Sequence, residues 1–161
     1  MWYYKGDVSK SIRRFKFRSA RHYAISYGRF LSAKIEEDFS GEFDLITWVP
    51  VSLARKLRRG YDQARLLAEA AARELSQEAV PLLKKIRNNE PQSGILSAAQ
   101  RRANVQGVYQ VIDPQQVRGK RILLVDDVIT TGATMSECAK ILLIAGAKEV
   151  SCIALASAMH Q

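Results

Sequence analysis

The most informative pattern of the sequence lies at residues 121–134, which read R-I-L-L-V-D-D-V-I-T-T-G-A-T. Four consecutive apolar residues at 122–125 predict a buried strand of a parallel sheet, which we expect to end at Asp126 and Asp127. A short loop follows, and after it apolar residues recur at helical spacing until Gly146, a typical residue to end a helix. The stretch therefore predicts a strand, an acidic pair, a small loop and a helix, in that order.

The loop after the acidic pair has the chemistry of an anion-binding site. Backbone N–H groups at a helix N-terminus are unpaired and attract negative charge, and a glycine lets the backbone wrap closely around a ligand. The residues expected to bind phosphate are Thr130, Thr131, Gly132, Ala133 and Thr134. Ionised carboxylates accept hydrogen bonds, so we expect Asp126 and Asp127 to hold a sugar diol, or Mg²⁺ through its water shell. The simpler alternative is that the acids only end a strand and that Thr130 only caps a helix.

This stretch resembles the binding motif for 5-phosphoribosyl-1-pyrophosphate (PRPP) of type I phosphoribosyltransferases: an apolar strand, two acids, two further residues and then T-T-G-x-T. Strands and helices also alternate along the chain, which predicts an α/β fold with a parallel, doubly wound sheet. The resemblance implies PRPP with Mg²⁺ as the ligand, Asp126 and Asp127 as the catalytic pair, and an N-terminal helical hood.

A second, basic segment is expected to face the same site. Residues 43–51 predict the first strand of the sheet, and a basic helix, Gly60 and a new helix capped by Asp62 follow. Ligands of open α/β sheets bind beyond the carboxyl ends of the strands, so this segment and the acidic pair can meet. By analogy with phosphoribosyltransferases, the residues expected at the pyrophosphate are Val51, Ser52, Arg55, Arg59, Gly60 and Gln63. The alternative for the cations is ordinary surface charge on a helix.

A polar segment at residues 87–98 predicts a mobile lid, because few of its side chains can pack in a core. Strands are predicted on either side of it, at 79–86 and 107–112, and a last buried strand at 150–156. The expected lid residues are Arg87, Gln92, Arg101 and Asn104.

Residues 1–36 predict a basic helical region, with one helix capped by Asp7 and a second one over residues 23–35. Between Asp7 and Glu36 there are eight lysines and arginines and no acid, and aromatic residues lie among them. Such a pattern indicates either a nucleic-acid surface or a solvated helix face, and we expect the aromatic residues themselves to be core. The candidate nucleic-acid contacts are Arg13, Arg14, Lys16, Arg18 and Arg58.

The composition narrows the class of protein. The 161 residues suggest a single domain, made of the helical region 1–36 and a core over 43–161. The net charge of +9 favours polyanions or phosphorylated substrates as partners. Without an apolar run of membrane-spanning length or a signal peptide, we expect a cytoplasmic protein. Cys138 and Cys152 fall in apolar patterns, which predicts that both thiols are buried in the core. The sequence has no C-x-x-C pair that would indicate a zinc site.

From about Tyr4 onward the chain also resembles the competence protein F family of phosphoribosyltransferase-like proteins. The family pattern V-P…R-G-[FY]-N-Q matches residues 49–50 and 59–63, with Asp62 in place of the usual asparagine. The lid resembles R-x-R-x-T-x-P-Q…L…R-x-x-N, with Lys85 and Asn89 as departures. Family members usually carry a four-cysteine zinc ribbon before this segment, and the present sequence has none.

The resemblance implies a role in the uptake of single-stranded DNA during natural transformation, together with a helicase partner. Two functions therefore stay open: a phosphoribosyltransferase with an unknown acceptor, and a single-stranded-DNA-binding scaffold without transferase activity. A scaffold for protein contacts alone would leave the intact phosphate motif unexplained.

Overall fold

The computed structural model describes residues 2–17, 22–39, 41–87 and 106–158. Some of the expected site residues lie outside these ranges: Arg18, Gln92, Arg101 and Asn104. For others only the backbone is described: Lys16, Arg55, Arg58 and Arg59.

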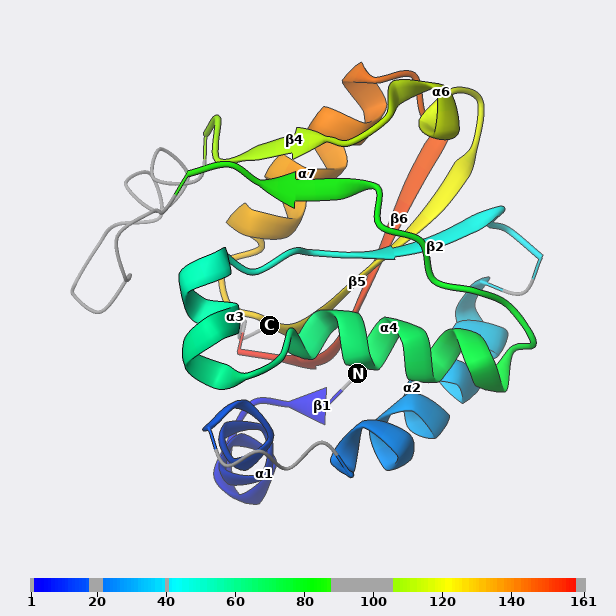
Figure 1. Cartoon of the computed structure of the whole chain (residues 1–161). Coiled ribbons are helices and arrows are strands. Elements are labelled where there is room, and N and C mark those ends of the chain that lie inside the picture. The colour runs from blue at the N-terminus through cyan, green and yellow to red at the C-terminus, as the bar shows by residue number, and fades with distance from the viewer. Residues whose placement is uncertain (1, 18–21, 40, 88–105, 159–161) are drawn as a thin grey trace.

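A four-stranded sheet forms the centre of the fold (Figure 1). Its strands lie in the order β1 (Trp2–Tyr3), β6 (Glu149–Ser157), β5 (Arg121–Ile129) and β2 (Leu45–Trp48), and every neighbouring pair is parallel. The predicted parallel α/β sheet is thereby confirmed. The strand β1 was not expected, because residues 1–36 predicted only helices, and β2 is shorter than the predicted 43–51.

Helices cover both faces of the sheet. The helices α2 (Tyr23–Phe39) and α4 (Gln63–Glu74) lie on one face, and α7 (Ala133–Ile144) lies on the other (Figure 1). Side chains of β5 point alternately to the two faces of the sheet. Leu123 and Val125 belong to the cluster under α2 and α4, whereas Ile122 and Leu124 belong to the cluster under α7. A strand buried on both faces reads as a continuous apolar run, as residues 122–125 do.

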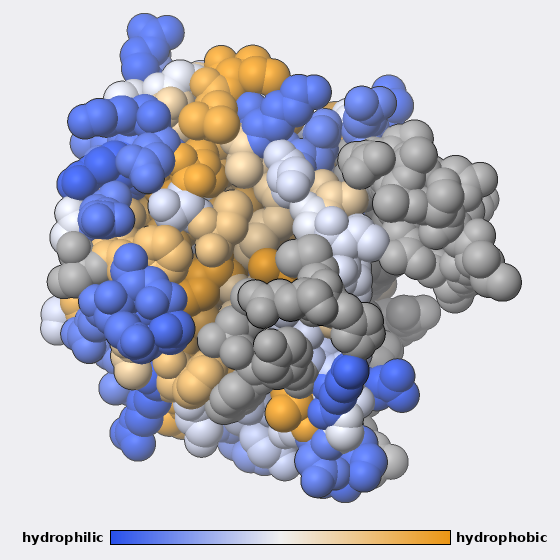
Figure 2. Space-filling model, turned by 180° about the vertical axis from the view of Figure 1, so that it is seen from behind, coloured by the Kyte–Doolittle hydropathy of each residue, from blue (hydrophilic) through white to orange (hydrophobic). Residues whose placement is uncertain are grey.

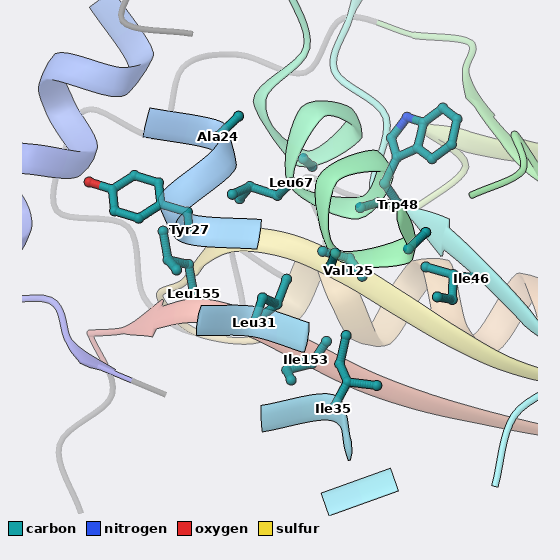
Figure 3. Close-up of a cluster of buried hydrophobic side chains, with 14 of the residues drawn as sticks. Ala24, Tyr27, Leu31, Ile35, Ile46, Trp48, Leu67, Val125, Ile153 and Leu155 are labelled. Carbon is teal, nitrogen blue, oxygen red and sulfur yellow. The ribbon is translucent and has the colours of Figure 1, made fainter. Parts of the chain in front are cut away.

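The cluster under α2 and α4 includes a close approach between these two helices. Figure 3 shows Leu31 and Ile35 of α2 beside Ile153 of β6, with Leu67 of α4 in the same cluster. Gly28 of α2 faces Ala70 of α4 so closely that a Cβ atom at Gly28 would lie 2.5 Å from the Cβ of Ala70. The glycine is therefore what allows these two helices to approach.

The first helix, α1 (Gly6–Phe17), completes this side of the core. Ile12 and Phe15 are fully buried, and the Phe15 ring meets Tyr27 of α2 edge-on at 5.6 Å between ring centroids. The hydroxyl of Tyr61 donates a hydrogen bond to the backbone carbonyl of Phe15. The expectation that aromatic residues of this region are core is confirmed for Phe15 and Tyr27.

The segment after α4 departs from the predicted parallel pattern. Ala79 forms an isolated parallel bridge with Ile46, but β3 (Leu83–Lys85) then pairs antiparallel with β4 (Tyr109–Val111) in a separate two-stranded sheet. The expectation that all strands join one parallel sheet is wrong here. The pairing with β2 stops after Val80, because Pro81 has no backbone N–H and the N–H of Leu82 donates to the hydroxyl of Thr47, at 3.3 Å, instead of to a backbone carbonyl. A short helix α6 (Pro114–Val117), capped by Asp113, leads into β5.

The opposite end of the sheet is tied by an ion pair between the starts of β2 and β5. Nη2 of Arg121 lies 2.9 Å from Oδ1 of Asp44, and the backbone N–H of Arg121 donates to the other carboxylate oxygen at 2.8 Å. These bonds lower the pKa of Asp44 to about 2.

Cys138 is fully buried, as predicted, but Cys152 is exposed, because the buried run of β6 begins only at the following residue.

Part of the surface of the molecule is hydrophobic. Figure 2, the view from behind, shows a band of hydrophobic surface between hydrophilic margins. Leu143 and Ile144, at the end of α7, are among the exposed large apolar side chains of the described residues. Across the described part of the chain, no helix combines the length and the apolar character needed to cross a membrane.

Candidate functional site

The acidic pair lies inside a strand, not at its end. The strand β5 continues through Asp126 and Asp127 to Ile129, and Val128 and Ile129 still align with Ala156 and Ser157 of β6. The prediction that the strand ends at the acids is therefore wrong. The pairing with the nine-residue β6 holds the extra residues in the sheet, an effect that apolar content alone does not reveal.

Because side chains alternate along a strand, the two acids point to opposite faces of the sheet. Asp126 lines the pocket at the start of α7, whereas Asp127 is buried on the side of α4, where its charge raises the pKa of Asp62. A carboxylate oxygen of Asp126 accepts the backbone N–H of Asp127 at 2.7 Å. The structure thus brings Asp126, but not Asp127, to the phosphate loop.

The predicted phosphate residues do form one pocket. It is an open hollow of about 290 Å³, part of which is bulk solvent, between the end of β5 and the first turn of α7. Its lining comprises Asp126, Val128, Ile129, Thr130, Thr131, Gly132, Ala133, Thr134 and Met135. All five residues expected to bind phosphate are therefore side by side around one hollow, with one carboxylate at its margin.

The helix above this pocket begins without a side-chain cap. Gly132, at φ +73°, occupies the N-cap position, and among the described residues no side chain bonds to the first turn. The first intrahelical bond runs from the N–H of Ser136 to the carbonyl of Gly132, at 2.8 Å. The alternative that Thr130 serves only as a cap is therefore wrong, and the N–H groups of the first turn face the pocket end of the helix.

The basic segment emerges at the same edge of the sheet, because β2 and β5 are parallel and in register. The N–H of Val49 still donates to the carbonyl of Val125, at 2.9 Å, before the chain turns at Pro50. The carbonyl of the buried Ser52 accepts the N–H of Lys56 at 2.9 Å, which starts the helix α3 (Leu53–Arg59). Figure 1 shows α3 at the end of the sheet where α7 begins.

Asp62 connects this segment to the next helix. One carboxylate oxygen accepts the N–H of Arg65 at 3.1 Å, which confirms the predicted cap of α4. The other oxygen accepts the N–H of Val51 at 3.3 Å, a contact that the sequence did not suggest. Burial raises the pKa of Asp62, the two N–H bonds oppose this rise, and Asp127 adds to it. Gly60, at φ +79°, provides the turn before Asp62, and Gln63 is buried at the start of α4.

Several of the N-terminal cations are in ion pairs with acids, some in the same helix and one far away in the sequence. Ion pairs join Lys10 to Asp7 at 2.9 Å and Arg29 to Glu74 at 3.5 Å, and Lys34 pairs with acids of its own helix. Arg13 and Arg14 are exposed on α1, and neither is in an ion pair with a described residue. Arg87 is exposed just after β3.

Comparison with known proteins identifies the family. The model for the phosphoribosyl transferase domain matches residues 62–161, which include the pocket and Asp62. Over 165 aligned residues the chain is 32% identical to competence protein F of Haemophilus influenzae, and the match covers 97% of this chain and 70% of that protein. This chain belongs to the competence protein F family of phosphoribosyltransferase-domain proteins.

Two further proteins are similar to this member of the competence protein F family, one in sequence and one in structure. The DNA utilization protein YhgH of Escherichia coli is 35% identical over 111 residues, which cover 66% of this chain and 46% of that protein. The chain therefore spans only about half the length of some curated relatives. The solved adenine phosphoribosyltransferase of Thermoanaerobacter pseudethanolicus superimposes with a TM-score of 0.52 and 25% identity, over 89% of this chain and 71% of that one. The type I phosphoribosyltransferase fold implied by the sequence is confirmed.

Proposed function

We propose that this chain binds PRPP together with Mg²⁺. The observation that carries the proposal is the pocket in which the five phosphate-motif residues surround one hollow beside Asp126. The ligand's 5-phosphate would accept hydrogen bonds from the first turn of α7 and from the hydroxyls of Thr130, Thr131 and Thr134. Asp126 would accept hydrogen bonds from the ribose hydroxyls.

The pyrophosphate of the same ligand would lie toward the segment after β2. The backbone at Val51 and Ser52 emerges at the same edge of the sheet as the pocket, and Arg55 and Arg59 follow in α3. Guanidinium groups suit phosphate oxygens because their paired N–H donors match them in geometry.

A magnesium ion fits this donor set only with help from the ligand. Among the described residues, no three or more His, Cys, Asp or Glu side chains are grouped so that they could hold a metal ion. Mg²⁺ usually binds through one or two carboxylates, water and substrate phosphates. Asp126, which lines the pocket, would hold such an ion directly or through water, whereas Asp127 lies on the other face of the sheet. When bound, the ion supplies positive charge to the leaving pyrophosphate in a phosphoribosyl transfer.

The carboxylate pair gives the first test. Replacing both Asp126 and Asp127 with asparagine is expected to weaken the binding of Mg²⁺·PRPP by about 100-fold or more, since each lost charge-assisted hydrogen bond contributes about 1.5–3 kcal/mol. Isothermal titration calorimetry on the parent and the variant measures this loss. The single variants sharpen the test: Asp126→Asn is expected to have the larger effect, because only Asp126 lines the pocket.

The matched control replaces Glu36 and Glu42 with glutamine. Both side chains are exposed, and the change in net charge equals that of the double asparagine variant. The control should bind PRPP as the parent does. A parent that binds no PRPP, or a double asparagine variant that binds it equally well, contradicts the proposal. If the parent binds, release of pyrophosphate in the presence of candidate acceptors then tests transferase activity.

A second candidate function is the binding of single-stranded DNA, in keeping with the competence and DNA utilization proteins among the relatives. The exposed Arg13 and Arg14 favour it, because described acids do not neutralise them. A helicase partner stays a prediction of the family resemblance.

Under this second proposal, affinity for single strands falls steeply as salt is added, since binding releases counterions. Replacing Arg13 and Arg14 with alanine is expected to reduce the slope of log K against log salt by about 0.7 for every phosphate group that the variant no longer neutralises. Lys10→Ala with Lys34→Ala is the control, because both of these lysines are in ion pairs. Fluorescence anisotropy with a labelled oligonucleotide measures both slopes, and an affinity independent of salt would exclude this mode of binding.

A further inference from the structure

We propose that Asp62 is the positioning residue of the pyrophosphate segment, residues 49–52: its carboxylate holds the backbone of Val51 against the start of α4. This inference rests on the proposed function, and it assigns to Asp62 a task beyond capping a helix. The observation is the pair of backbone hydrogen bonds that its two oxygens accept, one from Val51 and one from Arg65.

The chemistry of the side chain matches this geometry. An ionised carboxylate is an acceptor at both oxygens, and here two N–H donors, at 3.3 Å and 3.1 Å, take one oxygen each. The amide of an asparagine has a single acceptor oxygen, and its NH₂ group would face the second N–H donor. Asp62 therefore suits both contacts, whereas the asparagine usual in the family pattern would satisfy only one of them in this arrangement.

The residues around Asp62 make it a firm anchor. The preceding Tyr61 is buried and bonds through its hydroxyl to the carbonyl of Phe15, which ties this point of the chain to α1. The N–H of Gly60 donates to the carbonyl of Lys56 at 2.7 Å, which closes α3. Asp62 itself is 7% exposed, so water competes little for its oxygens. The segment that Val51 belongs to is thus held from a part of the molecule that is itself fixed.

The position of Asp62 is also electrostatically unfavourable. Its carboxylate is buried, and Asp127 on β5 acts on it as a like charge, while Lys56 acts in the opposite sense. Asp62→Asn removes this repulsion and one hydrogen bond together. We therefore expect the thermal stability of the Asp62→Asn variant to change little. The pyrophosphate segment, in contrast, loses the hydrogen bond that holds Val51. This separation distinguishes a positioning residue from a merely structural one.

Two halves of the ligand serve as the probes. In calorimetric titrations, Asp62→Asn is expected to weaken the binding of Mg²⁺·pyrophosphate about tenfold, the equivalent of one hydrogen bond, and to leave ribose 5-phosphate binding unchanged. Amide hydrogen exchange, followed by NMR without ligand, should show faster exchange at Val51. The control is Asp113→Asn, since Asp113 also caps a helix and also accepts two N–H donors, at 2.9 Å and 3.3 Å, away from the pocket.

The outcomes separate the two proposals. If the parent binds neither PRPP nor pyrophosphate, the proposed function fails, and the positioning role fails with it, whatever the exchange of Val51 shows. If the parent binds and Asp62→Asn binds pyrophosphate equally well, or if the exchange of Val51 is unchanged, the positioning role alone is overturned. If both halves of the ligand bind less tightly, Asp62 acts on the fold in general, which also overturns it. Asp62→Ala, which removes both acceptors, should lose pyrophosphate binding further.

Discussion

Replacing Phe15 with alanine is expected to lower the free energy of unfolding by about 3–5 kcal/mol, the range for a large aromatic side chain removed from a core. Phe15 is fully buried, and its ring lies 5.6 Å from that of Tyr27 and 5.9 Å from that of Tyr61, measured between centroids. The ring therefore joins α1 to α2 and to the segment before Asp62. Urea denaturation followed by circular dichroism measures the loss.

The control for this prediction is Ile25→Ala on α2. Ile25 is 55% exposed, so its replacement should change the stability by no more than about 0.5 kcal/mol. A loss for Phe15→Ala as small as that of the control would mean that α1 does not pack on the core in solution.

Replacing Gly28 with valine is the second large effect, with an expected loss of at least about 2 kcal/mol. The added Cβ would lie 2.5 Å from the Cβ of Ala70 and 2.9 Å from its carbonyl carbon, so the two helices must separate. These atoms of Ala70 belong to the helix backbone or are attached directly to it, so they cannot move aside as the end of a flexible side chain can. Since α2 and α4 together cover one face of the sheet, the separation would open the cluster beneath them. The shift of the urea midpoint between the parent and the Gly28→Val variant measures this loss of stability.

Ser26→Val provides the comparison, because it places the same side chain at an exposed position of the same helix. The Ser26→Val variant has the helix propensity of valine but not the clash with Ala70. Equal stability of the two valine variants would show that Gly28 and Ala70 are not in contact.

The local parts of the site could be predicted from the sequence, and the non-local parts could not. The loop at 130–134 and the helix after it follow from residues close in the chain, and both were found where they were expected. The direction of Asp126 and Asp127 depends on how far β5 stays paired with β6, a strand that begins some twenty residues later. The bond from Val51 to Asp62 spans eleven positions and depends on how α3 turns the chain.

The same distinction explains the N-terminal region. Its aromatic residues were expected to be core because their helical spacing is a local signal, and Phe15 and Tyr27 are buried. Its charges left two interpretations open, a nucleic-acid surface and a solvated helix face, because no acid lies between residues 8 and 35. Arg29 is in fact paired with Glu74, forty-five positions away, because α2 packs beside α4. Tertiary packing decides which cations stay available to a polyanion.

The pairing of β1 with β6 has a consequence for how the protein is made. Trp2 and Tyr3 take Ala156 and Ser157 as their partners, so β1 can join the sheet only after the distant β6 has been synthesised. At usual translation rates this delay is on the order of ten seconds. Until then, much of the core that covers the apolar face of α1 has not yet formed. In a nascent chain of this protein, β1 and α1 are therefore exposed to chaperones and proteases until β6 has been synthesised.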